Sequence, residues 1–192
     1  MNLRTGAVIF FSGGIALSLC DRVHIAYGVL EQANRSMFGQ APWVIPVFGL
    51  LSITVVAAFG WLRRAMGETA RAPDRVRTTI AAVLTLGAYA STGPLDGWGS
   101  ILLVVFAMLW VLRVAVEQGR CAVIFSLVLA AAGPLGEAAM SALGTFRYLH
   151  PDMGSVPSWL PGIYLLGGLL VAEVEAWVAP DRHEQPAVEP AA

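Results

Sequence analysis

Six long apolar runs, separated by short polar stretches, make up most of the chain. They cover residues 6–29, 42–62, 76–90, 99–116, 121–146 and 159–178. A helix that crosses the roughly 30 Å core of a bilayer needs about 20 residues, and these runs lack the alternating pattern of membrane strands. Because a helix satisfies its own backbone in lipid, the pattern predicts an all-α membrane protein, a bundle of six transmembrane helices within residues 1–178. The polar residues 179–192 are predicted to form a disordered tail.

Composition supports this fold class and argues against two classes of function. Hydrophobic residues make up 57% of the chain and charged residues only 13%, against about 25% charged in soluble domains. The 12 basic and 13 acidic residues leave no basic face for a phosphate backbone, which argues against nucleic-acid binding. All the basic residues are arginines, so covalent catalysis by lysine is excluded.

The distribution of arginines predicts the orientation. Nine arginines fall in the N-terminal segment, the second and fourth connections and the tail, whereas the opposite side has Arg22, Arg35 and Arg147. Both termini are therefore expected to be cytoplasmic. No small-residue cleavage site follows the first run, which is interpreted as a retained span rather than a signal peptide. We expect an integral, multi-pass protein of the bacterial inner membrane if the source is prokaryotic, or of the endoplasmic reticulum if it is eukaryotic.

Candidate ligand-binding residues gather in the fifth and sixth runs. Pro134 should bend the fifth helix and leave a gap beside it, and Glu137 follows within one turn. A carboxyl in a span costs about 2.5–3.5 kcal/mol, so Glu137 either contacts a ligand or hydrogen-bonds to a neighbouring helix. We predict that a neutral amphiphile fills a cavity between the first, fifth and sixth spans. Its predicted contacts are Gly133, Pro134, Glu137, Ser141, Thr145, Trp159, Gly167 and Gly168.

Residue size predicts how the helices are arranged. The second half of the fifth run is rich in small residues, which let helices approach closely, so this helix is expected to be central. The same small faces make homo-oligomers plausible. The bulky fourth run, residues 101–112, is expected to face lipid. Trp159 is expected to anchor the sixth span at the outer headgroups.

The end of the first run supports an alternative function. Asp21 and His24 are three residues apart and share one helix face. Together with Glu137 they could serve as acid and base in an intramembrane lipid-modifying enzyme, although polar anchoring near the headgroups also explains them. The three histidines are scattered, so no metal site is predicted. Transport usually requires interrupted helices in matching halves, and the sequence has one clear interruption.

Four short motifs occur in order along the chain: APWVIP at 41–46, PLD at 94–96, FRYLHPD at 146–152, and SWLP at 158–161 followed by Gly167-Gly168. Together with six spans, they resemble the Insig family of sterol-sensing regulators. The resemblance implies a non-enzymatic protein without a cofactor that binds a sterol-like or diacylglycerol-like lipid. It also implies that Asp96 contacts a protein partner. Glu137 departs from the uncharged polar residues of animal members, which leaves the ligand chemistry open.

Overall fold

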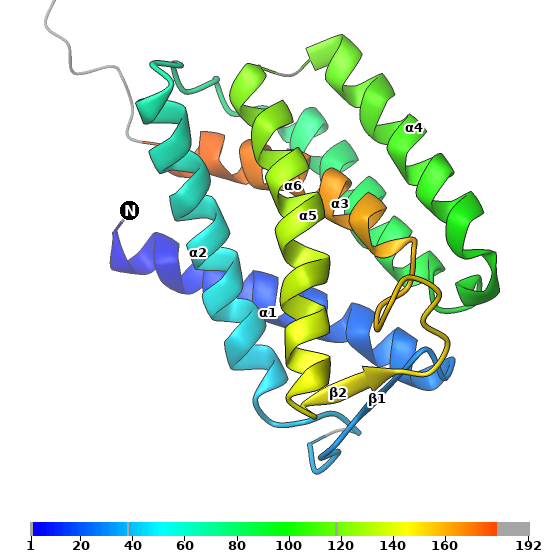
Figure 1. Ribbon diagram of the computed structural model, residues 1–192. Helices are drawn as coiled ribbons and strands as arrows, with labels where there is room; N and C mark the ends of the chain where they lie inside the picture. The colour runs from blue at the N-terminus through cyan, green and yellow to red at the C-terminus, as the bar shows by residue number, and fades with distance from the viewer. Residues whose placement is uncertain (1, 38, 118, 180–192) are drawn as a thin grey trace, which may run out of the picture.

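The computed structural model describes residues 2–37, 39–117 and 119–179, and within them the predicted all-α bundle is present (Figure 1). Its long helices are α1 (Leu3–Ala26), α2 (Val44–Ala65), α3 (Arg75–Ser91), α4 (Gly99–Glu117), α5 (Arg120–Ala142) and α6 (Leu160–Val178). A short 3-10 helix, η1 (Asp96–Trp98), precedes α4. Five of these segments are long and apolar enough to cross a membrane. Helix α3 has 17 residues, about 26 Å, and is the shortest. The predicted tail lies outside the described residues beyond Ala179.

Two helices end earlier than the hydrophobic pattern predicts. Helix α1 stops at Ala26 and α5 at Ala142, and each is followed by a glycine with positive φ, Gly28 at 69° and Gly144 at 75°. Glycine adopts this left-handed conformation without steric cost and so ends a helix. The freed segments form β1 (Leu30–Gln32) and β2 (Phe146–Tyr148), which pair antiparallel. The hydrophobic pattern did not predict this pairing of two distant loops.

The helices define two ends of the bundle. At the hairpin end, β1 and β2 join the loops that follow α1 and α5 (Figure 1). At the terminus end, α1 begins and α6 finishes, since Arg4, Thr78 and Val178 line one common hollow. The first and last described residues therefore lie at the same end of the bundle. Which compartment this end faces stays a prediction from the arginines.

Helix α6, rather than α5, occupies the centre. It packs against α2, α3, α4 and α5, whereas α5 packs mainly against α6 and, less extensively, α2. The reason is local: Gly162 and Gly168 of α6 admit Phe106 of α4 and Ser126 of α5. Small residues of α5 such as Ala132 and Gly136 instead point outward and are exposed. The prediction of a central fifth helix was therefore wrong.

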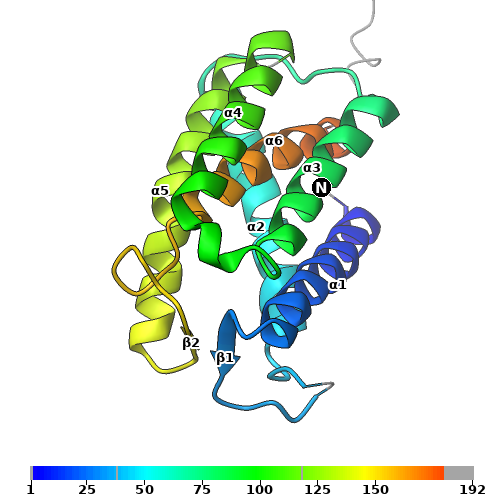
Figure 2. The ribbon, with the colours of Figure 1, turned by 90° about the vertical axis from the view of Figure 1, so that its right-hand side faces the viewer.

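Helix α4 is the least buried of the candidate spans, as its bulky sequence predicts. It lies at the edge of the bundle, opposite α2 (Figure 1). Its contact with the rest is made through Leu102 and Phe106, which join the core around Trp159 and Leu166. The view in Figure 2 shows α1 beside α3, a pair that also contact each other directly.

Candidate functional site

Glu137 lies near the end of α5 and is held by two tyrosines. Its Oε1 accepts a hydrogen bond of 2.7 Å from the Tyr164 hydroxyl of α6, and its Oε2 accepts one from Tyr148 of β2. Burial raises the pKa of Tyr148 well above its usual value, so this hydroxyl keeps its proton. The half-buried carboxyl therefore joins α5, β2 and α6. This is the bonding to neighbouring elements that the sequence offered as one of two interpretations.

Asp21 of α1 is bound in a similar way. Its Oδ1 accepts a 3.0 Å hydrogen bond from the Tyr89 hydroxyl of α3, and its Oδ2 accepts one of 2.9 Å from Gln32 of β1. The Gln32 Oε1 in turn accepts a 2.6 Å bond from the backbone N–H of Ala41, which fixes the orientation of the amide. The two carboxyls interact electrostatically. We call these residues the carboxyl cluster: Asp21, Gln32, Tyr89, Glu137, Tyr148 and Tyr164.

His24 is fully buried, but its side chain bonds to groups other than the two carboxyls. Its Nε2 lies 2.7 Å from Thr92 Oγ1 and 3.2 Å from the Tyr89 carbonyl oxygen. Because the Thr92 hydroxyl already donates to that carbonyl, the His24 Nε2 carries the proton as a donor. The hydrogen bonds among the described residues do not join His24 to Asp21 or Glu137. The structure thus brings Asp21 and Glu137 into one cluster and points His24 toward the end of α3.

Trp159 is fully enclosed by protein, with 0% exposure, so the expectation that it anchors at the headgroups was wrong. Its ring packs at 5.3 Å from His24 and 6.0 Å from Tyr148. Its Nε1 donates a 3.1 Å hydrogen bond to Asp96 Oδ1, while Asp96 Oδ2 lies 3.1 Å from His150 Nδ1. Asp96 therefore ties the start of α4 to the start of α6. Its predicted contact with a protein partner stays a prediction.

The other predicted contacts are mostly occupied by protein. A Cβ at Gly133 would collide with the Tyr164 ring, and one at Gly168 would lie 2.6 Å from the Ser126 Cα. Pro134 is buried within a continuous α5, and the Thr145 hydroxyl donates a 2.8 Å bond to the Met140 carbonyl. Space remains at Gly167, where a Cβ would meet only Thr85, at 4.0 Å. Ser141, half-buried near the end of α5, completes the predicted set.

Buried ion pairs hold the terminus end together. The Arg63 guanidinium of α2 donates to both carboxylate oxygens of Glu175, the shortest bond being 2.8 Å. Arg71 and Arg77 approach Glu173 at 3.8 and 3.5 Å. The carboxylates of the last helix are thus paired with arginines in and beside the second connection. These contacts fix one face of α6 against α2 and α3.

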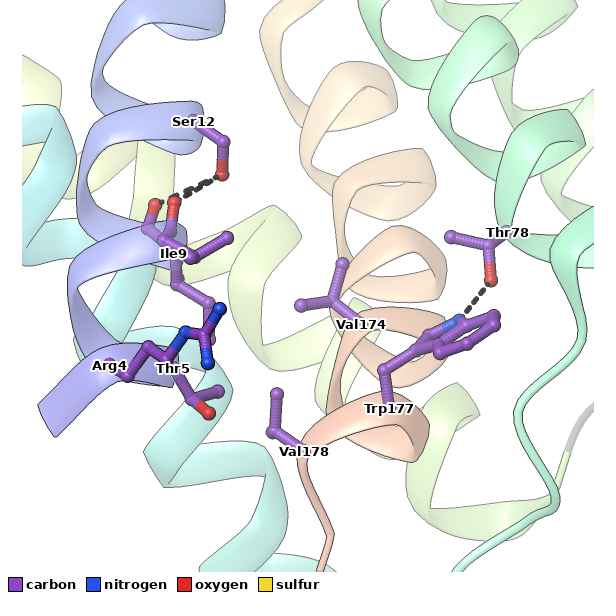
Figure 3. A pocket seen from close by; sticks show the side chains of 9 residues that line it. Arg4, Thr5, Ile9, Ser12, Thr78, Val174, Trp177 and Val178 are labelled. Atoms are coloured by element: carbon purple, nitrogen blue, oxygen red, sulfur yellow. Dashed lines mark hydrogen bonds between the residues drawn. The ribbon is translucent and has the colours of Figure 1, made fainter. Parts of the chain in front are cut away.

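An open hollow of about 480 Å³ lies on another face of α6 at this end. Figure 3 shows Arg4 of α1 and Trp177 of α6 bordering the space between these helices, with the Trp177 Nε1 donating a 2.8 Å hydrogen bond to Thr78 of α3. We call it the α1–α3–α6 hollow. Its walls are largely apolar. The lining residues are Arg4, Thr5, Val8, Ile9, Ser12, Thr78, Val174, Trp177 and Val178.

Sequence reasoning missed the tyrosines of the carboxyl cluster and the hollow. Tyr89 and Tyr164 lie in or beside apolar runs, where a hydroxyl needs a partner, so they were a usable signal for the partners of Asp21 and Glu137. The hollow had no comparable signal, because it depends on how α1 diverges from α6. Among the described residues, no three His, Cys, Asp or Glu side chains gather as a metal site.

Comparison with known proteins supports the fold. No protein-family model and no curated protein matches the sequence. The crystal structure of the mycobacterial Insig homolog MvINS from Mycobacterium vanbaalenii matches with a TM-score of 0.75, over 92% of this chain and 94% of that chain, at 19% identity. This chain has the Insig-homolog fold. A cross-linked trimer of a cysteine variant of MvINS matches with a TM-score of 0.77, over 97% and 98% of the two chains, also at 19% identity. The sequence resemblance is therefore confirmed at the level of the fold.

Proposed function

We propose that this protein is a non-enzymatic membrane protein that binds a neutral lipid, sterol-like or diacylglycerol-like, in the α1–α3–α6 hollow. The observation that carries the proposal is the hollow itself. Its volume of about 480 Å³ falls within the range of small-molecule sites, which are typically apolar with a few polar groups. The Insig-homolog fold supports a lipid ligand by analogy.

The lining matches the two parts of such a lipid. Val8, Ile9 and Val174 would contact the apolar tail or rings. Arg4, at the rim, would donate to a carbonyl or hydroxyl oxygen, since no hydrogen bond or ion pair engages it among the described residues. The Ser12 hydroxyl donates a 2.7 Å bond to the Val8 carbonyl, so its oxygen remains free to accept from a lipid hydroxyl.

The hollow shares α1 and α6 with the predicted cavity but has α3 in place of α5. A stripe of half-buried residues on α6 continues from it toward the carboxyl cluster, at helical spacing: Val178, Val174, Val171, Gly167 and Tyr164. The stripe supports a longer path for an acyl chain, past the open space at Gly167. In this proposal the predicted residues near Glu137 form the closed end of the path, and Gly167 borders it.

Filling the hollow tests this function. Val174→Trp should displace the lipid while leaving the fold intact, because the new ring enters open space. Val104→Trp, on the exposed face of α4, is the matched control. Lipids that copurify with each variant are measured by mass spectrometry, with thermal unfolding as the check on folding. A Val174→Trp protein that folds and retains the wild-type lipid complement would exclude the site.

We propose in addition that the protein assembles as a homo-oligomer with both termini in the cytoplasm. The MvINS trimer supports the assembly by analogy, and the exposed apolar face of α4 and the outward small residues of α5 offer contact surfaces. Crosslinking in native membranes tests the assembly. Labelling of cysteines introduced at residues 3 and 147 by a membrane-impermeant reagent tests the orientation, because only residue 147 should react from outside.

A further inference from the structure

The carboxyl cluster contains two acids and no hydrogen-bonded cation among the described residues. Each of the four carboxyl oxygens has one partner: Tyr89 and Gln32 for Asp21, and Tyr164 and Tyr148 for Glu137. The glutamates at the terminus end, by contrast, are paired with arginines. Two carboxylates without a hydrogen-bonded positive side chain are costly inside a membrane protein.

The hydrogen-bond partners of the two acids differ in whether they can accept a hydrogen bond as well as donate one. Gln32 must donate to Asp21, because its oxygen is held by the Ala41 N–H. A fixed donor favours the ionised form of its acceptor. Glu137 has two tyrosine hydroxyls, which can rotate and either donate or accept. A protonated Glu137 can therefore donate to either tyrosine oxygen, whereas Asp21 has one fixed donor, Gln32, and one hydroxyl that can rotate, Tyr89.

We propose that Glu137 holds a proton at neutral pH while Asp21 carries the negative charge, and that loss of this proton at higher pH loosens the junction of α5, β2 and α6. The mechanism is electrostatic: once Glu137 is ionised, its carboxylate and that of Asp21 repel each other within the carboxyl cluster. This inference does not rest on the proposed lipid site.

The titratable groups around Glu137 come from four packed elements. Helix α1 contributes Asp21, Cys20 and His24; α3 contributes Tyr89; β2 contributes Tyr148; and α6 contributes Tyr164. His24 Nε2 is engaged by Thr92 and the Tyr89 carbonyl. The charge that opposes a second carboxylate in the cluster is thus that of Asp21.

Infrared spectroscopy tests the assignment directly. The wild-type protein at neutral pH should show a protonated-carboxyl stretching band that disappears in Glu137→Gln and persists in Asp21→Asn. The Gln side chain mimics a protonated Glu in shape and charge, so this variant should fold. A wild-type protein without such a band in the wild-type minus Glu137→Gln difference overturns the proposal, as does a band that is lost only in Asp21→Asn.

Unfolding measured against pH gives a second readout. Because the folded state retains a proton that the unfolded state releases, stability should fall as pH rises through the neutral range. The unfolding equilibrium constant should rise by up to tenfold per pH unit. Glu137→Gln should remove that slope, whereas Tyr27→Phe, an exposed tyrosine, should keep it. An equal slope in wild type and Glu137→Gln would contradict a proton held by Glu137.

Discussion

The two ends of α6 accommodate buried acids in different ways. At the terminus end, Glu173 and Glu175 are neutralised by arginines of α2, α3 and the loop between them. At the hairpin end, Tyr164 meets Glu137 through a neutral hydroxyl, and the neighbouring Asp21 is also held by an amide and a hydroxyl. Arginine can reach an acid near the bundle end while its long stem lies along apolar surface. The acids at the hairpin end are held by hydroxyls and an amide, which need no desolvated cation.

The terminus end also differs in having open space beside its ion pairs. One face of α6 is closed by Arg63 and Glu175, while another borders the α1–α3–α6 hollow. At the hairpin end, the space beside Tyr164 is filled by α5 around Gly133. At the hairpin end, a close contact at a glycine leaves no space between α5 and α6. At the terminus end, ion pairs hold α6 to α2 and α3 beside the open hollow.

Breaking the Arg63–Glu175 pair should have the largest effect on stability. Arg63→Met leaves Glu175 buried without its partner, which costs about 3–5 kcal/mol when one member of a buried pair is removed. Unfolding in mixed micelles measures the loss. Arg75→Met, at an exposed arginine, should change stability by less than about 0.5 kcal/mol. Arg63→Met combined with Glu175→Leu should recover most of the loss, and a double variant as unstable as the single one would refute this reading of the pair.

Gly168→Leu should be the next most damaging change. The new side chain would meet the Ser126 backbone, and overpacking of this kind costs about 1–3 kcal/mol or more. Gly136→Leu is the matched control, because a Cβ there has nothing within 4 Å. The same unfolding measurement checks both. Equal stability of the two variants would show that α5 and α6 do not depend on their close contact.

These contacts show what the sequence could and could not predict. The spans were predictable because each apolar run maps onto one helix, and the misplaced ends are explained by Gly28 and Gly144. Which helix is central was not predictable, because a small residue indicates close helix packing only if it faces the interior of the bundle. Gly168 faces Ser126, whereas Gly136 faces outward. Pattern alone does not distinguish these two glycines.

Removing one hydroxyl from the carboxyl cluster should have a moderate effect. Tyr164→Phe deletes the 2.7 Å bond to Glu137 and should cost about 0.6–1.5 kcal/mol, the range for hydrogen bonds in membrane proteins. Tyr27→Phe, at an exposed tyrosine, should be neutral. Unfolding in mixed micelles again provides the measurement. A loss equal to that of Arg63→Met would contradict the distinction between the two ends.

The smallest expected effect on stability is that of the exposed ion pair between Glu31 and Arg147 on the hairpin. A hydrogen bond from Arg147, together with its charge, lowers the pKa of Glu31 below its usual 4.5. A lowered pKa means that the stabilisation is present above the unfolded value and is lost as pH falls through the folded value. Glu31→Gln should therefore flatten the pH dependence of stability slightly below about pH 4.5, and leave it unchanged at neutral pH. An unfolding series against pH, with Glu184→Gln in the tail as control, measures the difference.

The partners in the candidate site were harder to predict than its acids. Glu137 was identified because a carboxyl in an apolar run is unusual. Its partner Tyr148 is 11 residues away and Tyr164 is 27 away, so no local spacing connects them. Trp159 was misplaced because tryptophan near a span end usually faces the interface, and its bond to Asp96 across 63 positions carries no sequence signal.

The pairing of β1 with β2 has a consequence for synthesis of the chain. Glu31 and Arg147 face each other although 116 residues separate them. At a translation rate of roughly 5–20 residues per second, β1 leaves the ribosome about 6 to 23 seconds before β2. Helices α1 to α5 are therefore synthesised while the loop after α1 is still unpaired, and α6 follows once β2 is available to pair with it.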